Sequence, residues 1–226
     1  MRRLHTNVEI LAENFSFSGL RVVDVGCGTG DLVRWLTQQG ARVIGIDTPQ
    51  MLAKAQAEPA TGNERYWVGG AEALPVEDGW ADLMVYFASL HHAPLDRLTD
   101  ALAECSRVLK AGGEAAVVEP KAEPGSYFEI TRLPEDEADM QAAVYAAIQA
   151  APQFGLRLLK EEYFYIERSF ADYEKLIHTF VEGEKRRAEI IARARKITVK
   201  MSQAAGARFD DFRFRSICRL NVLKKK

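Results

Sequence analysis

Three glycines on alternate positions follow a short apolar run near the start of the chain. Residues 22–25 (Val-Val-Asp-Val) predict a buried strand, and Gly26, Gly28 and Gly30 come directly after it. Asp31 then begins a segment with helical spacing and is of a type that caps helices. A glycine turn between a strand and a helix lets the backbone approach a ligand without Cβ atoms in the way. Open α/β sheets bind their ligands at this carboxyl end of a strand.

The glycine spacing separates two classes of nucleotide ligand. A dinucleotide-binding loop has the spacing G-x-G-x-x-G. This chain has G-x-G-x-G, with Asp31 where the third dinucleotide glycine would stand. A carboxylate at that helix N-terminus would repel a pyrophosphate, so the spacing disfavours an NAD-dependent oxidoreductase.

A second acidic residue stands where a nucleoside site would need one. Residues 41–47 predict a strand that ends in Asp47, 21 positions after Gly26 (47 − 26). An acid about 20 residues beyond the glycine turn can accept hydrogen bonds from both ribose hydroxyls of a bound nucleoside. Asp47 therefore indicates a nucleoside cofactor without choosing among the possible ones.

Strands and helices must alternate to position these residues. The pattern predicts further strands at 65–68, 81–87, 115–119, 163–166 and 212–223. It predicts helices at 4–14, 31–39, 95–109, 140–151, 170–181 and 183–206, with Lys110–Gly113 ending the third of them. Residues 120–134 contain three prolines and are expected to form a loop. Alternation of this kind is typical of an α/β fold.

Composition narrows the function classes. The 226 residues are 47% hydrophobic and 27% charged, with a net charge of −2, so no strong field attracts nucleic acid or an anionic membrane. Scattered cysteines at 27, 105 and 218 predict neither a disulfide nor a zinc site, and no metal is expected. No apolar run approaches a signal peptide or a membrane span, so we expect no membrane insertion and a cytoplasmic protein.

The segment from Asp24 to Gly30 resembles motif I of the class I S-adenosylmethionine (SAM) dependent methyltransferases, whose pattern is D/E-x-G-x-G-x-G. In that family the glycine loop wraps the methionine half of SAM. The resemblance implies that Gly26, Cys27, Gly28 and Gly30 contact the cofactor. It also implies that Asp24 faces the ligand's ammonium directly or through water.

Two more segments extend the resemblance toward the adenine. Residues 48–57 are similar to the family's D-x-S-x-x-M-L-x-x-A segment, and Thr48 would lie along the adenine. Residues 70–78 are similar to D-A-E-x-L-P-F-x-D, but Gly70 stands where an Asp or Asn often binds the adenine amino group. Backbone groups of Ala71 or the carboxylate of Glu72 would have to replace it.

The end of the fourth predicted strand carries the candidate catalytic residues. Phe87 ends that strand and counts among the implied cofactor contacts. The following residues are similar to the A-L-H-H of small-molecule methyltransferases such as the ubiquinone and menaquinone C-methyltransferases. His92 or His91 is the candidate general base for a hydroxyl or carbon-acid acceptor. Two adjacent histidines cannot both face the core, so at least one should open onto the cleft; polar packing or helix capping is the alternative.

The resemblance, which ends with Arg107–Gly113 matching the family's R-V-L-K-P-G-G, covers residues 20–120 and implies one Rossmann-like methyltransferase domain. Its sheet would have seven strands, mostly parallel with one antiparallel, and helices on both faces. The single domain would comprise an N-terminal helix (1–19), a cofactor-binding core (20–119), a cover for the acceptor site (120–182) and a C-terminal helix with the last strand (183–226).

The implied activity is transfer of the SAM methyl group to a small-molecule acceptor by in-line displacement, with S-adenosylhomocysteine as product. Aromatic side chains of the cover could line the acceptor site, although core packing is the commoner role: Tyr127, Phe128, Tyr145, Tyr163 and Tyr165. A non-catalytic SAM-binding protein and an RNA methyltransferase that uses the basic helix 183–206 stay open. Nucleic acid is disfavoured because the chain is slightly acidic and no N-P-P-Y or D-P-P-Y sequence follows the fourth strand.

Overall fold

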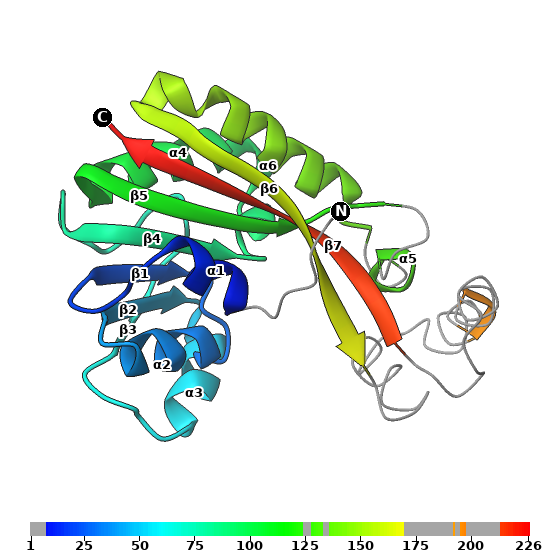
Figure 1. Ribbon diagram of the computed structural model, residues 1–226, viewed down its shortest axis with the longest axis horizontal. Coiled ribbons are helices and arrows are strands. Elements are labelled where there is room, and N and C mark those ends of the chain that lie inside the picture. Colours follow the sequence, from blue (N-terminus) through cyan, green and yellow to red (C-terminus); the bar gives the residue numbers. More distant parts are fainter. Residues whose placement is uncertain (1–7, 124–127, 133–135, 170–191, 193–194, 198–212) are drawn as a thin grey trace.

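A seven-stranded sheet forms the centre of the protein in the computed structural model, which describes residues 8–123, 128–132, 136–169, 192, 195–197 and 213–226. The strand order is β3-β2-β1-β4-β5-β7-β6 (Figure 1). The strands are β1 (Arg21–Val25), β2 (Arg42–Asp47), β3 (Arg65–Val68), β4 (Ala81–Phe87), β5 (Leu109–Pro120), β6 (Leu156–Ser169) and β7 (Arg213–Lys225).

Only β7 runs against its neighbours in this sheet. The pairings among β1 to β5 are parallel, and β7 pairs antiparallel with both β5 and β6. The predicted α/β fold, with seven strands of which one is antiparallel, is confirmed. The described helices are α1 (Glu9–Asn14), α2 (Asp31–Gln38), α3 (Pro49–Ala57), α4 (Leu98–Val108), α5 (Phe128–Thr131) and α6 (Ala138–Ala150), with 3-10 turns η1 (Leu90–His92), η2 (Leu95–Arg97) and η3 (Ala151–Phe154).

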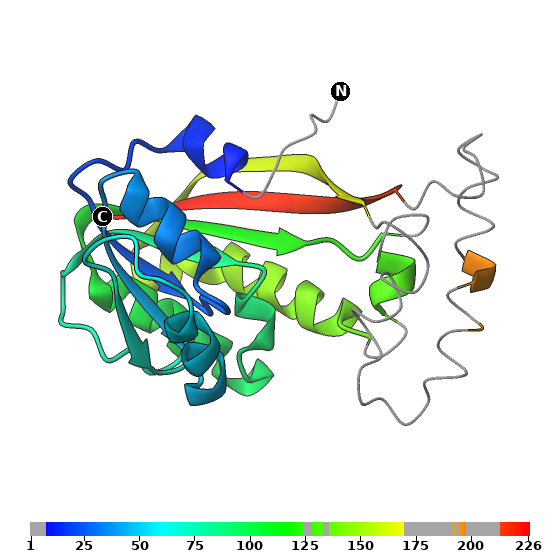
Figure 2. The ribbon, with the colours of Figure 1, turned by 90° about the horizontal axis from the view of Figure 1, so that it is seen from below.

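Helices cover both faces of the sheet, as expected. Side chains alternate along a strand, so Val22 packs with α1 and α2 while Val23 packs with α4 and α6. Leu36 of α2 and Ile148 of α6 are both fully buried on their respective sides. Figure 2 shows α1 and α2 (blue) on one side of the sheet and α6 (yellow-green) on the other. Two apolar layers therefore hold the strand ends in fixed positions.

The structure corrects several expected boundaries. Gly30, at φ +78°, is the N-cap of α2, and Asp31 is its first residue rather than its cap. The Asp31 carboxylate instead accepts a hydrogen bond from Thr29 Oγ1 at 2.8 Å and pairs with Arg34. The predicted loop 120–134 contains the short helix α5.

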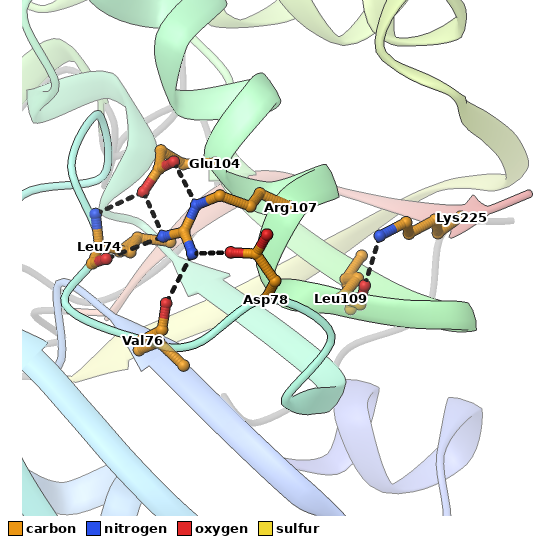
Figure 3. Close-up of polar contacts among 7 residues, drawn as sticks. All are labelled: Leu74, Val76, Asp78, Glu104, Arg107, Leu109 and Lys225. Carbon is orange, nitrogen blue, oxygen red and sulfur yellow. Dashed lines mark hydrogen bonds and ion pairs between the residues drawn. The ribbon is translucent and has the colours of Figure 1, made fainter.

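Strands β5 and β6 are longer than their sequence patterns predict. β5 begins at Leu109, directly after α4, so Lys110–Gly113 lies in a strand with an irregular register rather than at a helix end. The Leu109 carbonyl accepts a hydrogen bond from Lys225 Nζ at 2.7 Å (Figure 3). β6 runs from Leu156 to Ser169 because β7 pairs with it along its whole length. Strands β6 and β7 go on pairing with each other beyond the point where β5 ends at Pro120.

Arg107 ties the loop after β3 to helix α4 (Figure 3). Its guanidinium donates hydrogen bonds to the carbonyls of Leu74 at 2.9 Å and Val76 at 2.7 Å, and it pairs with Asp78 and Glu104. The Glu104 carboxylate in turn accepts the Leu74 N–H at 2.8 Å. Arg107, the arginine of the R-V-L-K segment, thus anchors residues 70–78 to α4.

Some expectations concern residues outside the described ranges. These are the helices at 170–181 and 183–206, apart from helical residues at 192 and 195–197, together with His5 and Tyr127. Among the described residues, no helix has both the length and the apolar character needed to cross a membrane. Cys27, Cys105 and Cys218 are all buried, and none of them forms a disulfide.

Candidate functional site

The carboxyl ends of the central parallel strands meet at one edge of the sheet. The register places Val25 of β1 beside Ile46 of β2 on one side and Tyr86 of β4 on the other. Phe87 of β4 in turn lies beside Val118 of β5. The topology therefore brings the glycine loop, the end of β2 and the segment after β4 together, although they are far apart in the sequence.

The glycine loop needs glycine for two separate reasons. Gly26, Gly28 and Gly30 all have positive φ, between +56° and +78°. A Cβ on Gly26 would lie 2.4 Å from the Ser89 Cβ, and one on Gly30 would lie 2.6 Å from the Tyr66 hydroxyl oxygen. At Gly28 a Cβ would meet only the Met51 methyl, at 3.8 Å. The loop is thus packed tightly at its two ends and open at its centre, where a ligand could approach the backbone.

Asp24 is a buried carboxylate without a hydrogen-bond partner. Its side chain is 1% exposed, and neither of its oxygens has a hydrogen bond in the described part of the chain. Burial and the nearby charge of Asp47 raise the pKa of Asp24 to about 7. An unpaired buried carboxylate is costly, so the site is suited to a ligand that brings a cation or a hydrogen-bond donor.

The Asp47 carboxylate is held in place by backbone groups at the end of β2. Its Oδ2 accepts the N–H of Gly28 at 2.8 Å, and its Oδ1 accepts the N–H of Thr48 at 2.7 Å. Each carboxylate oxygen retains a second acceptor direction. Asp47 is partly exposed, so these directions can accept from the paired hydroxyls of a ribose. Thr48 itself caps α3, accepting from the Met51 N–H at 3.5 Å.

The loop after β3 brings Glu72 over Gly70. A Cβ on Gly70 would lie 2.6 Å from Oε2 and 2.7 Å from Oε1 of Glu72. Ala71 is buried between them, and the Ala73 N–H donates to the Gly70 carbonyl at 3.1 Å. The carboxylate of Glu72 therefore occupies the space of the side chain that residue 70 lacks.

The two adjacent histidines in η1 differ sharply in environment. His91 is buried, with Nδ1 hydrogen-bonded to Glu119 Oε2 and Nε2 3.5 Å from Glu137 Oε2. Burial opposes a charge on this ring, but the hydrogen bonds to Glu119 and Glu137 outweigh it and raise the pKa of His91 to about 9. His92 is exposed, and its ring centroid is 4.1 Å from that of His91. One of the two is thus exposed, and its expected place in the cofactor cleft stays a prediction.

Sequence reasoning missed the carboxylates around His91 and the serine before it. Glu119 stands at the end of β5, a position where an acid signals a site; its Oε1 also accepts the Leu90 N–H at 2.9 Å. Glu137 precedes α6 and carries no local signal. Ser89 donates to the Val25 carbonyl at 2.6 Å and so joins this cluster to the glycine loop.

The aromatic candidates of residues 120–182 lie mainly against cations. The Arg219 guanidinium lies 3.8 Å from the Tyr145 ring centre, and Lys121 Nζ lies 5.6 Å from that of Tyr163. Arg215 lies 5.9 Å from the centre of the Tyr165 ring, and Phe128 is buried. These contacts explain the positions of the rings without a ligand, so their role as acceptor contacts stays a prediction.

The sheet order and the strand-end geometry define a class of protein. An inserted antiparallel strand beside β5, a glycine loop after β1 and a carboxylate at the end of β2 are the architecture of the class I SAM-dependent methyltransferases. The unpaired Asp24 carboxylate and the open backbone at Gly28 fit the ammonium and the chain of the SAM methionine moiety.

Comparison with known proteins agrees with this classification. Residues 23–117 match a family model described as a methyltransferase domain. The malonyl-[acyl-carrier protein] O-methyltransferase of Pectobacterium atrosepticum is 37% identical over 108 residues, which cover 47% of this chain and 41% of that protein. The demethylmenaquinone methyltransferase of Lactiplantibacillus plantarum is 29% identical over 193 residues, covering 79% and 76%. The chain is thus similar to methyltransferases over residues 23–117, and SAM is the cofactor of the class I enzymes that this segment resembles.

Solved structures share the fold along nearly the whole chain. A methyltransferase structure from Bacillus halodurans aligns with a TM-score of 0.70 at 17% identity, covering 97% of this chain and 98% of that one. The match to the first curated relatives is shorter, and the chain spans about half the length of those proteins.

Proposed function

We propose that this protein is an enzyme that methylates a small molecule with SAM. The observation that carries the proposal is the buried, unpaired Asp24 carboxylate beside the open centre of the glycine loop. SAM supplies an activated methyl group on a sulfonium when it is bound. The name of the demethylmenaquinone methyltransferase refers to a small-molecule acceptor, which supports one here, whereas the name of the other relative refers to a malonyl group on an acyl-carrier protein.

The residues at the strand ends would hold the cofactor. Asp24 receives the ammonium, and the Asp47 carboxylate, already oriented by two backbone N–H groups, receives the ribose hydroxyls. Gly26, Cys27, Gly28 and Gly30 form the loop around the methionine moiety. The proposed cofactor contacts on the adenine and methyl sides are completed by Thr48, Ala71, Glu72 and Phe87. Catalysis then depends chiefly on alignment and on exclusion of water, which well-ordered groups provide.

His92 is the better candidate of the two histidines for activating the acceptor. Both ring nitrogens of His91 face carboxylates, and its raised pKa keeps the ring protonated at neutral pH. A protonated ring cannot accept a proton. His92 is exposed beside it and can accept one from a hydroxyl or a carbon acid. An amine or thiolate acceptor would not need this step.

Calorimetric titration tests the cofactor assignment. We expect SAM and S-adenosylhomocysteine to bind and NAD not to bind. Asp47→Ala should weaken both ligands about 100-fold, since two charge-assisted hydrogen bonds are lost. Glu77→Ala, which removes an exposed carboxylate from the loop after β3, is the matched control and should bind normally. Absence of SAM binding to folded, ligand-free protein would refute the proposal.

Turnover separates an enzyme from a SAM-binding protein without activity. Conversion of SAM to S-adenosylhomocysteine in a metabolite extract should be detectable, and His92→Ala should lower it while leaving SAM affinity nearly unchanged. Equal turnover in the variant would remove His92 from catalysis. Cofactor binding without turnover in any extract would favour the non-catalytic alternative, and steeply salt-dependent tRNA binding would favour an RNA substrate.

A further inference from the structure

Three potential metal ligands converge where η1 meets the start of α6. They are His91, His92 and Glu137, whose ligand atoms all lie within 4.8 Å of one another. The His91 Nε2 atom is 3.5 Å from the Glu137 Oε2 atom, and the two imidazole rings are 4.1 Å apart between centroids. The His91–Glu137 pair has the spacing of two ligands of one tetrahedral ion, whose bonds are about 2.0–2.2 Å long.

The buried carboxylate of Glu119 orients this set. It binds the Nδ1 side of His91 through one oxygen, while its other oxygen accepts the Leu90 N–H at 2.9 Å. The ring is therefore turned so that Nε2 points toward Glu137. A carboxylate that holds one nitrogen of a histidine while the other nitrogen binds the metal is the usual support for a metal-ligating histidine. This arrangement is an observation separate from the proximity of the three ligands.

Charge and exposure also suit a divalent cation. One divalent ion balances the two negative charges of Glu119 and Glu137, and its binding displaces the proton that His91 carries in the metal-free protein. Glu137 is partly exposed and His92 is exposed, so a bound ion would retain an open side. Two imidazoles and one carboxylate favour Zn²⁺, Mn²⁺, Fe²⁺, Co²⁺ or Ni²⁺ over Mg²⁺ and Ca²⁺, which prefer oxygen ligands.

The position of the set connects it to the proposed cofactor site. Ser89 immediately precedes η1 and contacts the backbone of the glycine loop, with its hydroxyl on the Val25 carbonyl at 2.6 Å. Helix α6, which Glu137 precedes, packs against η1 and is anchored to the core by Val144 and Ile148. The three ligands thus come from rigid elements next to the expected methyl group.

We propose that His91, His92 and Glu137 bind one divalent transition-metal ion, with Glu119 as a positioning residue, and that the open side of the ion takes an oxygen atom of the methyl acceptor. Binding of the ion does not depend on the proposed function. The role of the ion toward the methyl acceptor rests on the proposed function. In the ion-free protein His92 keeps the role of base described above, and with the ion bound its ring nitrogen would serve as a ligand.

Metal titration of the full chain, free of any tag and stripped by a chelator, tests the proposal. We expect one equivalent of Zn²⁺ to bind with micromolar or tighter affinity in calorimetry. Co²⁺ should produce the visible absorption of a nitrogen-ligated ion. His92→Ala and Glu137→Gln should each weaken Zn²⁺ binding at least tenfold and alter the Co²⁺ spectrum. Glu119→Gln should weaken it 10–100-fold.

His178→Ala is the matched control, because it removes another histidine of the chain and should leave the binding of both metals unchanged. The proposal would be overturned if the wild-type protein bound Zn²⁺ no more tightly than His92→Ala does. It would also be overturned if His178→Ala lost as much Zn²⁺ affinity as His92→Ala. Titration of the same samples with S-adenosylhomocysteine reports on the fold and on the cofactor site. Normal binding of that ligand without Zn²⁺ binding would refute the metal site alone and leave the proposed function intact.

Discussion

The Glu72 carboxylate lies directly above the Cα of Gly70. A Cβ on that glycine would stand 2.6 Å from one carboxylate oxygen and 2.7 Å from the other. If residues 70–78 line the adenine as proposed, Glu72 supplies the carboxylate there from two residues further along the loop than Gly70.

The first prediction exchanges these two residues. Glu72→Ala should weaken S-adenosylhomocysteine binding 10–100-fold, as loss of one hydrogen bond from a charged group requires. Adding Gly70→Asp to that variant should restore most of the affinity, since Gly70 does not have positive φ and tolerates a side chain. Calorimetry checks both variants, with S-inosylhomocysteine, which lacks the adenine amino group, as the comparison ligand. An unchanged affinity in Glu72→Ala would remove Glu72 from the site.

Asp24 should destabilise the ligand-free protein at neutral and alkaline pH. Its pKa is raised from an ordinary value of 3.8 to about 7 in the folded protein, which therefore holds the proton more tightly than the unfolded chain does. Wild-type stability should fall as pH rises from about 4 to 7, by up to about 4 kcal/mol. The Asp24→Asn variant has no carboxyl group to ionise, so its free energy of unfolding should rise relative to that of the wild type between about pH 4 and pH 7. Its SAM binding should be weaker. Urea unfolding at pH 5, 6, 7 and 8 measures the difference.

Asp82→Asn is the control for that experiment. Hydrogen bonds from Lys110 and Arg21 outweigh burial and lower the pKa of Asp82 to about 2, so it is charged in folded and unfolded chains above pH 5. Its effect on the free energy of unfolding should be independent of pH from 5 to 8. A pH-independent effect of Asp24→Asn over the same range would contradict the assignment of a raised pKa to Asp24.

Arg107 should contribute to both stability and cofactor affinity. Arg107→Met removes the donors to the Leu74 and Val76 carbonyls and the partner of Glu104. We expect a loss of about 1–3 kcal/mol in the free energy of unfolding and weaker S-adenosylhomocysteine binding, because the loop that carries Glu72 loses its anchor. Arg65→Met, at an exposed position on β3, is the matched control. Equal stabilities of the two variants in urea would refute this role.

Ala88 holds a left-handed conformation between β4 and the histidines. Its φ is +51°, and its N–H donates to the Val118 carbonyl at 2.7 Å. Because the position is exposed, Ala88→Val tests backbone strain rather than packing, and it should cost about 1–3 kcal/mol. Ala88→Gly should change stability by no more than about 1 kcal/mol. Thermal unfolding measures both; equal melting temperatures for the Val and Gly variants would contradict the strain.

Local sequence patterns determined much of the fold. Short runs of strand-forming residues bounded by turn residues placed β1, β2, β3 and β4 within one residue of their observed bounds. The lengths of β5 and β6 could not be read in the same way. Their outer parts depend on pairing with β7, a strand distant in the sequence, and that pairing compensates for weak local preference.

The sequence by itself determined which residue types stand at the strand ends, and hence the glycine loop, Asp24, Asp47 and the histidine pair as candidates. Tertiary structure decided what each of them faces. Glu119 and Glu137 reach His91 only because β5 lies beside β4 and α6 crosses η1, contacts that no local pattern encodes. The same packing buries one histidine between carboxylates and leaves the other exposed, so neighbouring residues with the same side chain acquire different surroundings.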